Sequence, residues 1–314
     1  MNIVIPGGSG QLGQILARHF HAQGHNTIVL SRFPAPTPWN TIHWDAVHPG
    51  EWTRALENSD VCINLTGRSV NCRYTPANRK LIYETRIQST RLLNLVIASL
   101  EAPPRVWLNA STATIYRHSL DRAMGEDGEL GGSEAGAPDT WNFSIAVAKD
   151  WEKAFLETAT PRTRKIAMRT AIVMSPNSGG AFDILMKLVR RGLGGPQGSG
   201  GQFVSWLHEA DFVRAVDFLI EHEDRGGVVN LASPNPLPNH EFMQALRIAW
   251  GTPAGLPAPA WLIEIAAVFM RTESELVLKS RRVIPTSLLN EGFEFFYPNW
   301  ADAAEELASR WPSH

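Results

Sequence analysis

Residues 2–16 read NIVIPGGSGQLGQIL, in which an apolar run leads through four glycines into a helix-like run. Gly8, Gly10 and Gly13 fit the pattern GxGxxG, and Gly7, Gly10 and Gly13 fit GxxGxxG. A strand that turns tightly into a helix needs residues without a Cβ, and the bare backbone lets a pyrophosphate reach the N–H groups at the helix N-terminus. The stretch therefore predicts a dinucleotide-binding turn rather than an ordinary glycine-rich turn. The residues of the turn expected to contact the cofactor are Gly7, Ser9, Gly10, Gln11, Leu12 and Gly13.

The residues after the next apolar run, at 27–30, indicate which nicotinamide cofactor is bound. An acidic side chain in that place accepts a hydrogen bond from the ribose 2′-hydroxyl of NAD. No acidic residue occurs before Asp45, and Ser31 and Arg32 occupy the place instead. A guanidinium pairs with a phosphate through two hydrogen bonds, whereas a carboxylate would repel it. We therefore expect NADP(H), with Arg32 on the 2′-phosphate and Ser31 donating beside it; the alternative is a solvated surface arginine.

Composition limits the classes of protein that remain. The chain has 314 residues, a net charge of −2 and dispersed basic residues, which argues against a nucleic-acid-binding protein. Its apolar runs are too short to span a bilayer and its N-terminus lacks a basic leader, so we expect a cytoplasmic protein with no membrane insertion. Cys62 and Cys72 are expected to be reduced thiols. The expected partner is a small-molecule substrate, and the oligomeric state stays open.

Strand-like and helix-like segments alternate through the first half of the chain. This rhythm predicts an α/β fold with a Rossmann-type doubly wound parallel sheet. We expect residues 1–174 to form an NADP(H)-binding domain to which 228–233 returns. Residues 175–227 and 234–314 are expected to form a smaller, mostly helical substrate lobe. The glycine-dense segment 192–201 in that lobe is expected to border the ligand cleft.

Hydroxyl side chains follow the apolar strand expected at 105–109, in the run NASTATIY of residues 109–116. In a parallel sheet the carboxyl ends of the strands face the ligand crevice. A hydroxyl there either hydrogen-bonds a substrate carbonyl or caps the next element.

The run at 109–116 resembles the SS-x-x-V-Y-G segment of extended short-chain dehydrogenases, whose glycine spacing is GxxGxxG. Within that group the chain resembles the nucleotide-sugar epimerase family typified by YfcH, over nearly its whole length. The matching motifs are Ser31-Arg32, Trp44-Asp45, Asn64-Leu65-Thr66-Gly67, Thr85-Arg86-Ile87, GLGGPQGSG at 192–200, Ser205-Trp206-Leu207-His208, Arg282-Val283-Ile284-Pro285 and Gly292-Phe293-Glu294-Phe295. The resemblance implies NADP(H) binding, a Rossmann core, a family-specific C-terminal domain and a catalytic hydroxyl at Thr112. It also implies cofactor contacts from Asp45, Leu65, Thr66, Gly67, Arg86, Ser111, Lys149 and Ala171.

The resemblance fails at the residues that would move a proton. Short-chain dehydrogenases use a tyrosine placed four residues before a lysine. Here Lys149 is the candidate lysine, and Ile145 stands where the tyrosine is expected. Tyr116 is the nearby phenol, and it is either a substitute acid or a packed, hydrogen-bonded side chain. Lys149 is expected to hold the nicotinamide ribose, unless it is a solvated charge on its helix.

The segment after the glycine-dense loop resembles the family's substrate-facing corner. Gln202, Trp206 and His208 are its candidate substrate-binding residues, because an amide, an aromatic face and an imidazole suit a base or a sugar. His208 and Asp211 are interpreted as a structural hydrogen-bonded pair rather than a catalytic dyad. The sequence shows no metal-ligand spacing, so no metal is expected.

Two functions are compatible with these observations. The first is an NADP(H)-dependent oxidoreductase or epimerase that acts on a carbonyl or a nucleotide-sugar-like small molecule. The second is an NADP(H)-binding sensor or regulatory protein without turnover, which the isoleucine at position 145 would permit.

Overall fold

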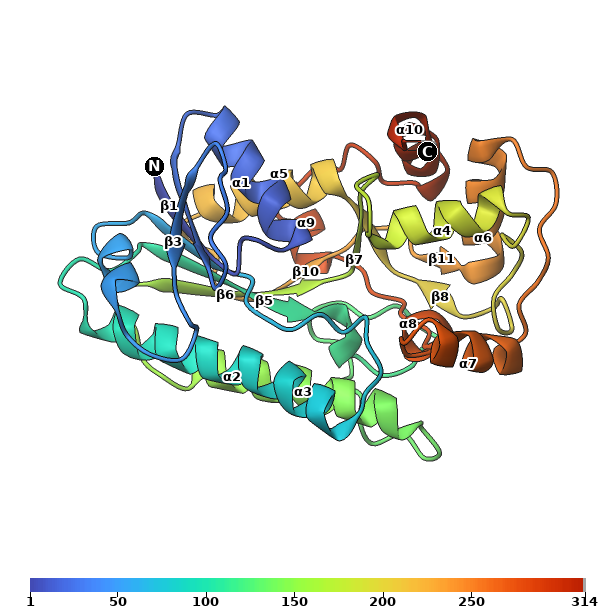
Figure 1. Ribbon diagram of the computed structural model, residues 1–314, viewed down its shortest axis with the longest axis horizontal. Coiled ribbons are helices and arrows are strands. Elements are labelled where there is room, and N and C mark those ends of the chain that lie inside the picture. The colour runs from blue at the N-terminus through green and yellow to red at the C-terminus, as the bar shows by residue number, and fades with distance from the viewer. Residues whose placement is uncertain (313–314) are drawn as a thin grey trace.

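The computed structural model describes residues 1–312 and is built on a seven-stranded sheet whose paired strands are all parallel (Figure 1). The strand order is β10-β6-β5-β4-β1-β2-β3. The strands are β1 (Asn2–Pro6), β2 (Asn26–Ser31), β3 (Asn40–His43), β4 (Val61–Asn64), β5 (Val106–Thr112), β6 (Arg164–Thr170) and β10 (Gly227–Leu231). The order reverses between β1 and β4, and ligands of such sheets bind outside the carboxyl ends of the strands at this point.

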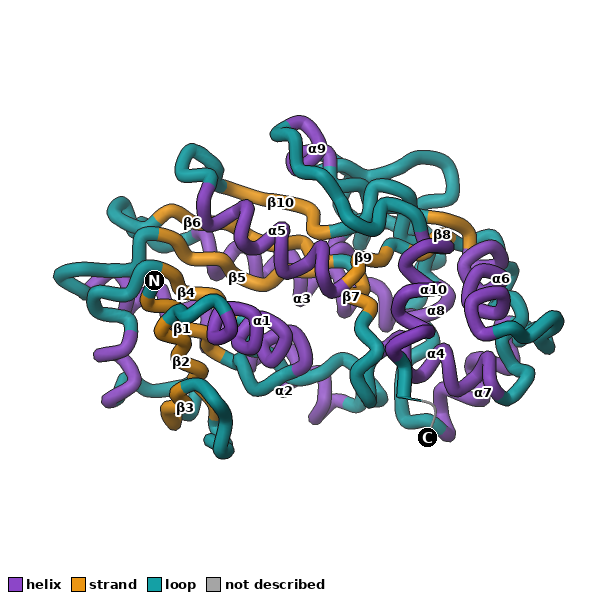
Figure 2. The backbone as a smooth tube through the Cα atoms, turned by 90° about the horizontal axis from the view of Figure 1, so that it is seen from above, coloured by secondary structure: helices purple, strands orange, loops and turns teal. Residues whose placement is uncertain are grey.

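Helices cover both faces of the sheet (Figures 1 and 2). The helices α1 (Gln11–Ala22) and α5 (Glu209–Glu221) contact one another on one face, and α2 (Pro76–Ser99) and α3 (Asp139–Leu156) do so on the other. Alternation along β1 separates the two cores, since Ile3 and Ile5 pack with α1 and α5, and Val4 packs under α2 and α3. The prediction of a Rossmann-type doubly wound sheet is confirmed.

The rest of the chain forms a smaller part around a second core, to the right in Figure 1. Its elements are β7 (Ile172–Met174), α4 (Ala181–Arg190), β8 (Phe203–Val204), β9 (Trp206–His208), β11 (Leu237–Pro238), α6 (Asn239–Trp250), α7 (Ala260–Phe269), α8 (Glu275–Leu278) and α10 (Trp300–Arg310). The helix α9 (Thr286–Asn290) contacts β10 of the large sheet instead. The short 3-10 helices η1 (Glu51–Ala55) and η2 (Ala113–Ile115) complete the set.

The glycine-dense segment 192–201 does not border the cleft described below, so this expectation was wrong. Its backbone pairs instead with the segment before α7: Leu256 N–H donates to Gly192 O, and Gly198 N–H donates to Ala258 O. A Cβ on Gly195 would lie 2.4 Å from the backbone of Leu256. The glycines therefore permit a close approach of two chain segments rather than of a ligand.

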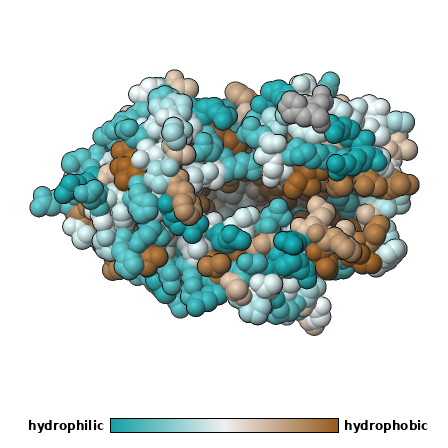
Figure 3. Space-filling model, viewed as in Figure 1, coloured by the Kyte–Doolittle hydropathy of each residue, from teal (hydrophilic) through white to brown (hydrophobic). Residues whose placement is uncertain are grey.

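The helix α7 is apolar around most of its circumference, and only Ala267 of it is buried. Trp261 is 64% exposed and Phe269 is 82% exposed, and hydrophobic residues gather over this helix in Figure 3. No helix within residues 1–312 has the length and hydropathy that crossing a membrane requires.

Candidate dinucleotide and substrate cleft

A cavity of about 460 Å³ lies at the carboxyl ends of the central strands. Its walls come from the turn after β1, the loop after β4, the ends of β5 and β6, one face of α3, and the segment 275–281 of the C-terminal part. The surface is hollowed near the middle of the face shown in Figure 3. The cleft therefore occupies the point where the strand order reverses, as the topology requires.

The glycine turn is held together by backbone contacts that leave no room for side chains. Gly7 has a φ of +74°, and a Cβ there would lie 2.7 Å from the backbone of Thr66; a Cβ on Gly13 would lie 2.3 Å from Gly8 Cα. A Cβ on Gly10, in contrast, meets only Gly7 O at 3.7 Å, so this side of the turn is open. The helix α1 begins there with no side-chain cap and no acidic residue in its first turn. This N-terminus fits the pyrophosphate of a dinucleotide.

Most of the predicted turn residues line the cavity: Gly7, Gly10, Gln11, Leu12 and Gly13 do so. Ser9 is exposed at the tip of the turn and is not part of the lining. The side chain of Gln11 lies against Gly180, where an added Cβ would meet Gln11 Nε2 at 2.3 Å. The segment before α4 thus approaches the phosphate end of the cleft.

Leu65, Thr66 and Gly67 line the cavity after β4, as expected. Asn64 Oδ1 accepts a hydrogen bond from Thr66 N–H at 3.1 Å and fixes this turn. The hydroxyl of Thr66 is buried and has no hydrogen-bond partner among residues 1–312, so it is free to bond to a cofactor. Arg86 also lines the cavity; its guanidinium lies over the Trp151 ring at 5.1 Å, and burial lowers the pKa of Arg86 to about 10.

Ser31, Arg32 and Asp45 lie outside the lining of the cavity. The hydroxyl of Ser31 is engaged by both the N–H and the C=O of Phe33, each at 3.2 Å. Asp45 holds its own turn by accepting hydrogen bonds from His48 and Val47, and these bonds hold the pKa of its carboxyl well below the usual range. Arg32 is exposed, and β2 ends beside the glycine turn, since Gly7 N–H donates to Leu30 O at 2.9 Å. Arg32 therefore lies, exposed, just after the strand that adjoins the glycine turn.

Ser111, Thr112 and Ala171 line the cavity from the ends of β5 and β6. Ser111 Oγ donates to Glu152 Oε1 at 2.5 Å. Thr112 Oγ1 accepts a hydrogen bond from Thr114 N–H at 3.1 Å, which is the capping role that the sequence left open. Its hydroxyl proton remains free to donate into the cleft.

Tyr116 is not brought to the cleft, which removes it as a substitute acid. Its side chain is 2% exposed; the hydroxyl donates to Asn230 Oδ1 and accepts from Arg169 Nη1, both at 2.8 Å. Burial raises the pKa of its phenol. The residue is the packed, hydrogen-bonded tyrosine of the alternative interpretation.

Lys149 is not brought to the cleft either. Its ammonium donates to Gly131 O at 2.6 Å, and Ile145 is buried, with its side chain beside Gly131. The face of α3 that lines the cavity carries Ser144 and Ala148 instead. One residue turns an α-helix by about 100°, so Ile145 and Lys149 lie on a different face of α3 from Ser144 and Ala148. The two cleft-facing positions with the same four-residue spacing supply a hydroxyl and a methyl group, not a phenol and an ammonium.

The three predicted substrate residues do not line the cavity. Trp206 is fully buried against Trp300, with ring centroids 4.8 Å apart. Gln202 is buried and donates to Gln197 O at 2.7 Å. The sequence-based assignment of a substrate-facing corner is corrected here, because this corner packs the second core.

His208, the third of these residues, caps α5: its Nδ1 accepts a hydrogen bond from Ala210 N–H at 3.0 Å, and its Nε2 bonds to Glu306 at 2.9 Å. Asp211 accepts hydrogen bonds from the N–H groups of Phe296 and Tyr297. Both residues have structural partners, as interpreted, but they are not bonded to each other.

Sequence reasoning missed a group of polar side chains that also lines the cavity and comes from other elements than the glycine turn. It consists of Tyr74, Ser144, Glu275 and Arg281. Ser144 Oγ donates to Glu275 Oε2 at 2.6 Å, and Tyr74 Oη lies 3.2 Å from Ser144 Oγ. Arg281 Nη2 lies 3.6 Å from Glu275 Oε1, and Arg281 Nε donates to Thr114 Oγ1 at 3.1 Å. The one sign of this group in the sequence was the hydroxyl of Ser144, which stands four residues before Ala148 on α3.

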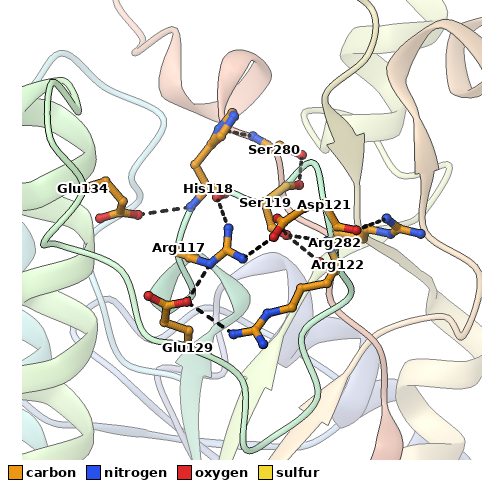
Figure 4. A network of polar contacts seen from close by, with 9 residues as sticks. All are labelled: Arg117, His118, Ser119, Asp121, Arg122, Glu129, Glu134, Ser280 and Arg282. Carbon is orange, nitrogen blue, oxygen red and sulfur yellow. Dashed lines mark hydrogen bonds and ion pairs between the residues drawn. The ribbon is translucent and has the colours of Figure 1, made fainter.

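The C-terminal residues of this group are anchored to the Rossmann part from both sides. Before α8, Glu273 accepts hydrogen bonds from Arg73 Nη1 and Tyr74 N–H. After α8, the segment 280–282 is bound by the loop that follows β5, as Figure 4 shows. Ser280 N–H donates to His118 Nδ1 at 3.1 Å, and Arg282 Nη1 donates to Asp121 O at 3.2 Å. Glu275 and Arg281 are therefore fixed parts of the cleft wall.

Comparison with known proteins agrees with this geometry. The chain is 30% identical over 312 residues to the human epimerase family protein SDR39U1, covering 98% of this chain and 100% of the relative. It is 28% identical to the epimerase family protein YfhF of Bacillus subtilis, covering 98% of both chains. A crystal structure of human SDR39U1 with NADPH superimposes with a TM-score of 0.86 at 29% identity, covering 99% of this chain and 100% of that one. A UDP-N-acetylglucosamine 4-epimerase from Bacillus cereus, at 16% identity and a TM-score of 0.72 over 98% of this chain and 95% of that one, shares the fold.

Two family descriptions match the chain in succession. Residues 258–307 match a domain of unknown function, DUF1731, which contains the Glu275 and Arg281 of the cleft. Residues 3–232 match the NAD dependent epimerase/dehydratase family, which confirms the resemblance inferred from the motifs. Because that match spans most of the chain, this protein belongs to the NAD dependent epimerase/dehydratase family.

Proposed function

We propose that this protein is an NADP(H)-dependent oxidoreductase or epimerase that acts on a carbonyl or nucleotide-sugar-like small molecule, in the cytoplasm. One observation carries the proposal: a single cavity joins an open helix N-terminus that suits a pyrophosphate to a polar end that contains a carboxylate, two hydroxyls and a guanidinium. The NADPH bound to human SDR39U1 supports the choice of cofactor.

The residues that would hold the dinucleotide are those whose polar groups are free in the structure. The backbone N–H groups at the start of α1 would bind the pyrophosphate, the unpartnered hydroxyl of Thr66 would bond to a ribose or phosphate oxygen, and Arg32 would pair with the 2′-phosphate. When bound, a nicotinamide cofactor supplies or accepts a hydride. Thr112 Oγ1 would donate to the substrate oxygen next to the carbon that changes oxidation state.

Calorimetric titration with NADPH and NADH tests the cofactor assignment, and NADPH oxidation against a panel of carbonyls and UDP-sugar ketones tests the reaction. We expect NADPH to bind at least about tenfold more tightly, since the 2′-phosphate adds charge-assisted hydrogen bonds of about 1.5–3 kcal/mol. Equal affinities for the two cofactors would refute the NADP(H) assignment. Binding of NADPH without turnover of any substrate in the panel would refute the assigned reaction.

A sensor or regulatory protein without turnover is the second candidate. It is favoured by one observation: the face of α3 that lines the cleft offers Ser144 and Ala148, so α3 contributes no phenol and no ammonium to the reaction. This candidate predicts tight NADPH binding, a different unfolding stability in the NADP⁺-bound and NADPH-bound states, and no hydride transfer to the panel.

A further inference from the structure

We propose that Glu275 is the acid–base catalytic residue of this cleft, that its Oε1 exchanges a proton with a substrate oxygen, and that Ser144 and Tyr74 are its positioning residues. The proposal rests on the proposed function, because it assigns a group to the reaction in the same cavity. It places the proton chemistry on the C-terminal domain of unknown function rather than on the Rossmann part.

The hydrogen bonds around Ser144 have a direction that the structure determines. Ser144 has one hydroxyl proton, and it donates that proton to Glu275 Oε2 at 2.6 Å. The contact of 3.2 Å with Tyr74 Oη must then use the tyrosine proton, with Ser144 Oγ as acceptor. Burial raises the pKa of Tyr74 to about 12, so its phenol stays protonated and keeps this role at neutral pH. The chain of hydrogen bonds thus runs from the Tyr74 hydroxyl through the Ser144 hydroxyl to Glu275 Oε2.

The other oxygen of Glu275 has no such partner. The residue is 1% exposed, and its Oε1 accepts no hydrogen bond from any residue of the described chain. Arg281 Nη2, at 3.6 Å, is too far away to donate a hydrogen bond but supplies a compensating positive charge. A buried carboxylate oxygen without a donor is costly and rare in native structures. A substrate hydroxyl, or a proton on Oε1 shared with a carbonyl, would satisfy it.

Glu275 also differs in kind from the rest of the cavity wall. Among the described residues that line the cavity there is no histidine, lysine or cysteine, and Glu275 is the one carboxylate. The other ionisable side chains of the wall are arginines and Tyr74, which keep their protons at neutral pH. Glu275 is therefore the one side chain of this wall that belongs to the classes which commonly serve as general acid or base, and that can do so without giving up an arginine or phenol proton.

Reduction of a carbonyl transfers one hydride and one proton to the substrate. The substrate carbon gains a hydride, whose electron pair comes from the reduced nicotinamide as it is oxidised. The O–H bond on Glu275 Oε1 breaks, a new O–H bond forms on the substrate oxygen, and the carboxylate that remains is paired with Arg281. In the oxidative direction, the same carboxylate accepts the proton of the substrate hydroxyl.

The test compares the wild type with E275Q, with the conservative variant E275D, and with the control E264Q. Glu264 is an exposed carboxylate on α7 that is not part of the cavity wall, and a glutamine there keeps an oxygen for the Ser274 hydroxyl. NADPH affinity is measured by fluorescence titration, and hydride transfer by stopped-flow single turnover with 9,10-phenanthrenequinone as the carbonyl probe. We expect E275Q to bind NADPH as the wild type does and to transfer hydride about 10²–10⁴-fold more slowly. E275D should recover part of the rate, and E264Q should match the wild type.

A second measurement does not need turnover. The oxidised nicotinamide carries a positive charge that the reduced ring lacks, so a carboxyl group in the same cavity should bind fewer protons when NADP⁺ replaces NADPH. Calorimetry in buffers of different ionisation enthalpy, between pH 5 and 8, gives the proton count for each cofactor. We expect a difference between NADP⁺ and NADPH that E275Q abolishes and E264Q keeps.

The outcomes separate this proposal from the function on which it rests. Hydride transfer by E275Q at the wild-type rate would overturn the role of Glu275 and leave the proposed function standing. A wild type that binds NADPH but reduces no carbonyl would overturn the proposed function, and identical proton counts in the wild type and E275Q would then overturn the role of Glu275 as well. S144A tests the positioning role: we expect an unchanged NADPH affinity, a lower rate of carbonyl reduction, and a displaced alkaline limb of the pH–rate profile, on which the rate falls as the pH rises. A purely structural serine would leave that limb in place.

Discussion

Replacing Gly7 by alanine should add two energetic costs that glycine avoids in the dinucleotide turn, and a control variant at Gly24 separates them. The first is the left-handed backbone, since φ is +74° and an L-residue there loses about 1–2 kcal/mol. The second is overlap, because the new Cβ would lie 2.7 Å from Thr66 Cα and N, and such overpacking costs about 1–3 kcal/mol. Gly24 provides the matched control, since its φ is +79° and an added Cβ meets nothing within 4 Å.

Both variants share the backbone cost and the same change in unfolded-chain entropy. The difference between their free energies of unfolding therefore gives the cost of the overlap alone. We expect Gly7→Ala to be less stable than Gly24→Ala by about 1–3 kcal/mol in urea unfolding followed by fluorescence. Calorimetry should show weakened NADPH binding in Gly7→Ala and unchanged binding in Gly24→Ala, because only the first displaces the loop that carries Thr66. Equal stability losses in the two variants would refute the argument that close approach to Thr66, rather than φ, requires glycine at position 7.

Three further outcomes are expected. In calorimetric titrations, Arg32→Ala should bring NADPH and NADH affinities together by roughly tenfold or more and leave NADH binding unchanged; an unchanged ratio would remove Arg32 from the 2′-phosphate. Burial lowers the pKa of Lys279 to about 7, so between pH 7 and about 10 the unfolded chain binds more protons than the folded one and stability rises with pH. The Lys279→Met variant lacks this group, so its free energy of unfolding should rise less steeply with pH than that of the wild type. The difference in slope should be up to about 1.4 kcal/mol per pH unit, measured by urea unfolding. Arg169→Met should cost about 3–5 kcal/mol in the same assay, because it leaves the buried carboxylate of Glu152 without the guanidinium 2.8 Å away; a loss below about 1 kcal/mol would contradict this account.

The Rossmann sheet and its glycine turn could be predicted because their signals are local. The apolar run of β1, the glycine spacing and the amphipathic α1 lie within about twenty residues of one another, and each is imposed by backbone geometry. The aromatic residues were less informative, since an indole that packs a core and one that meets a ligand look alike in sequence. Trp206 packs against Trp300, a contact that no local pattern reveals.

The register of α3 shows a second limit. Its amphipathic pattern predicts a helix, but a shift of one position changes which residues face the cleft, and the candidate lysine, Lys149, lies on a face that does not line the cavity. The assignment of His208 has a related cause: the resemblance places it in a substrate-facing corner, although Glu209 begins an amphipathic helix that His208 caps. In α3 and in α5 the local pattern of apolar residues was present in the sequence, but the residue roles were assigned from the family motif instead.

The reacting end of the cleft could not be predicted because it is assembled from residues that lie far apart in the chain. Tyr74 and Glu275 meet through Ser144, and the partners that fix them, such as Glu273 with Arg73, are about 200 residues distant from each other. The cofactor end, in contrast, is built within the first 70 residues together with the ends of the central strands. This division has a physical consequence: changes in residues 273–283 alter the groups that meet the substrate without touching the glycine turn. Two relatives with the same dinucleotide motif can therefore bind the same cofactor and catalyse different reactions, and the motif by itself specifies only the first property.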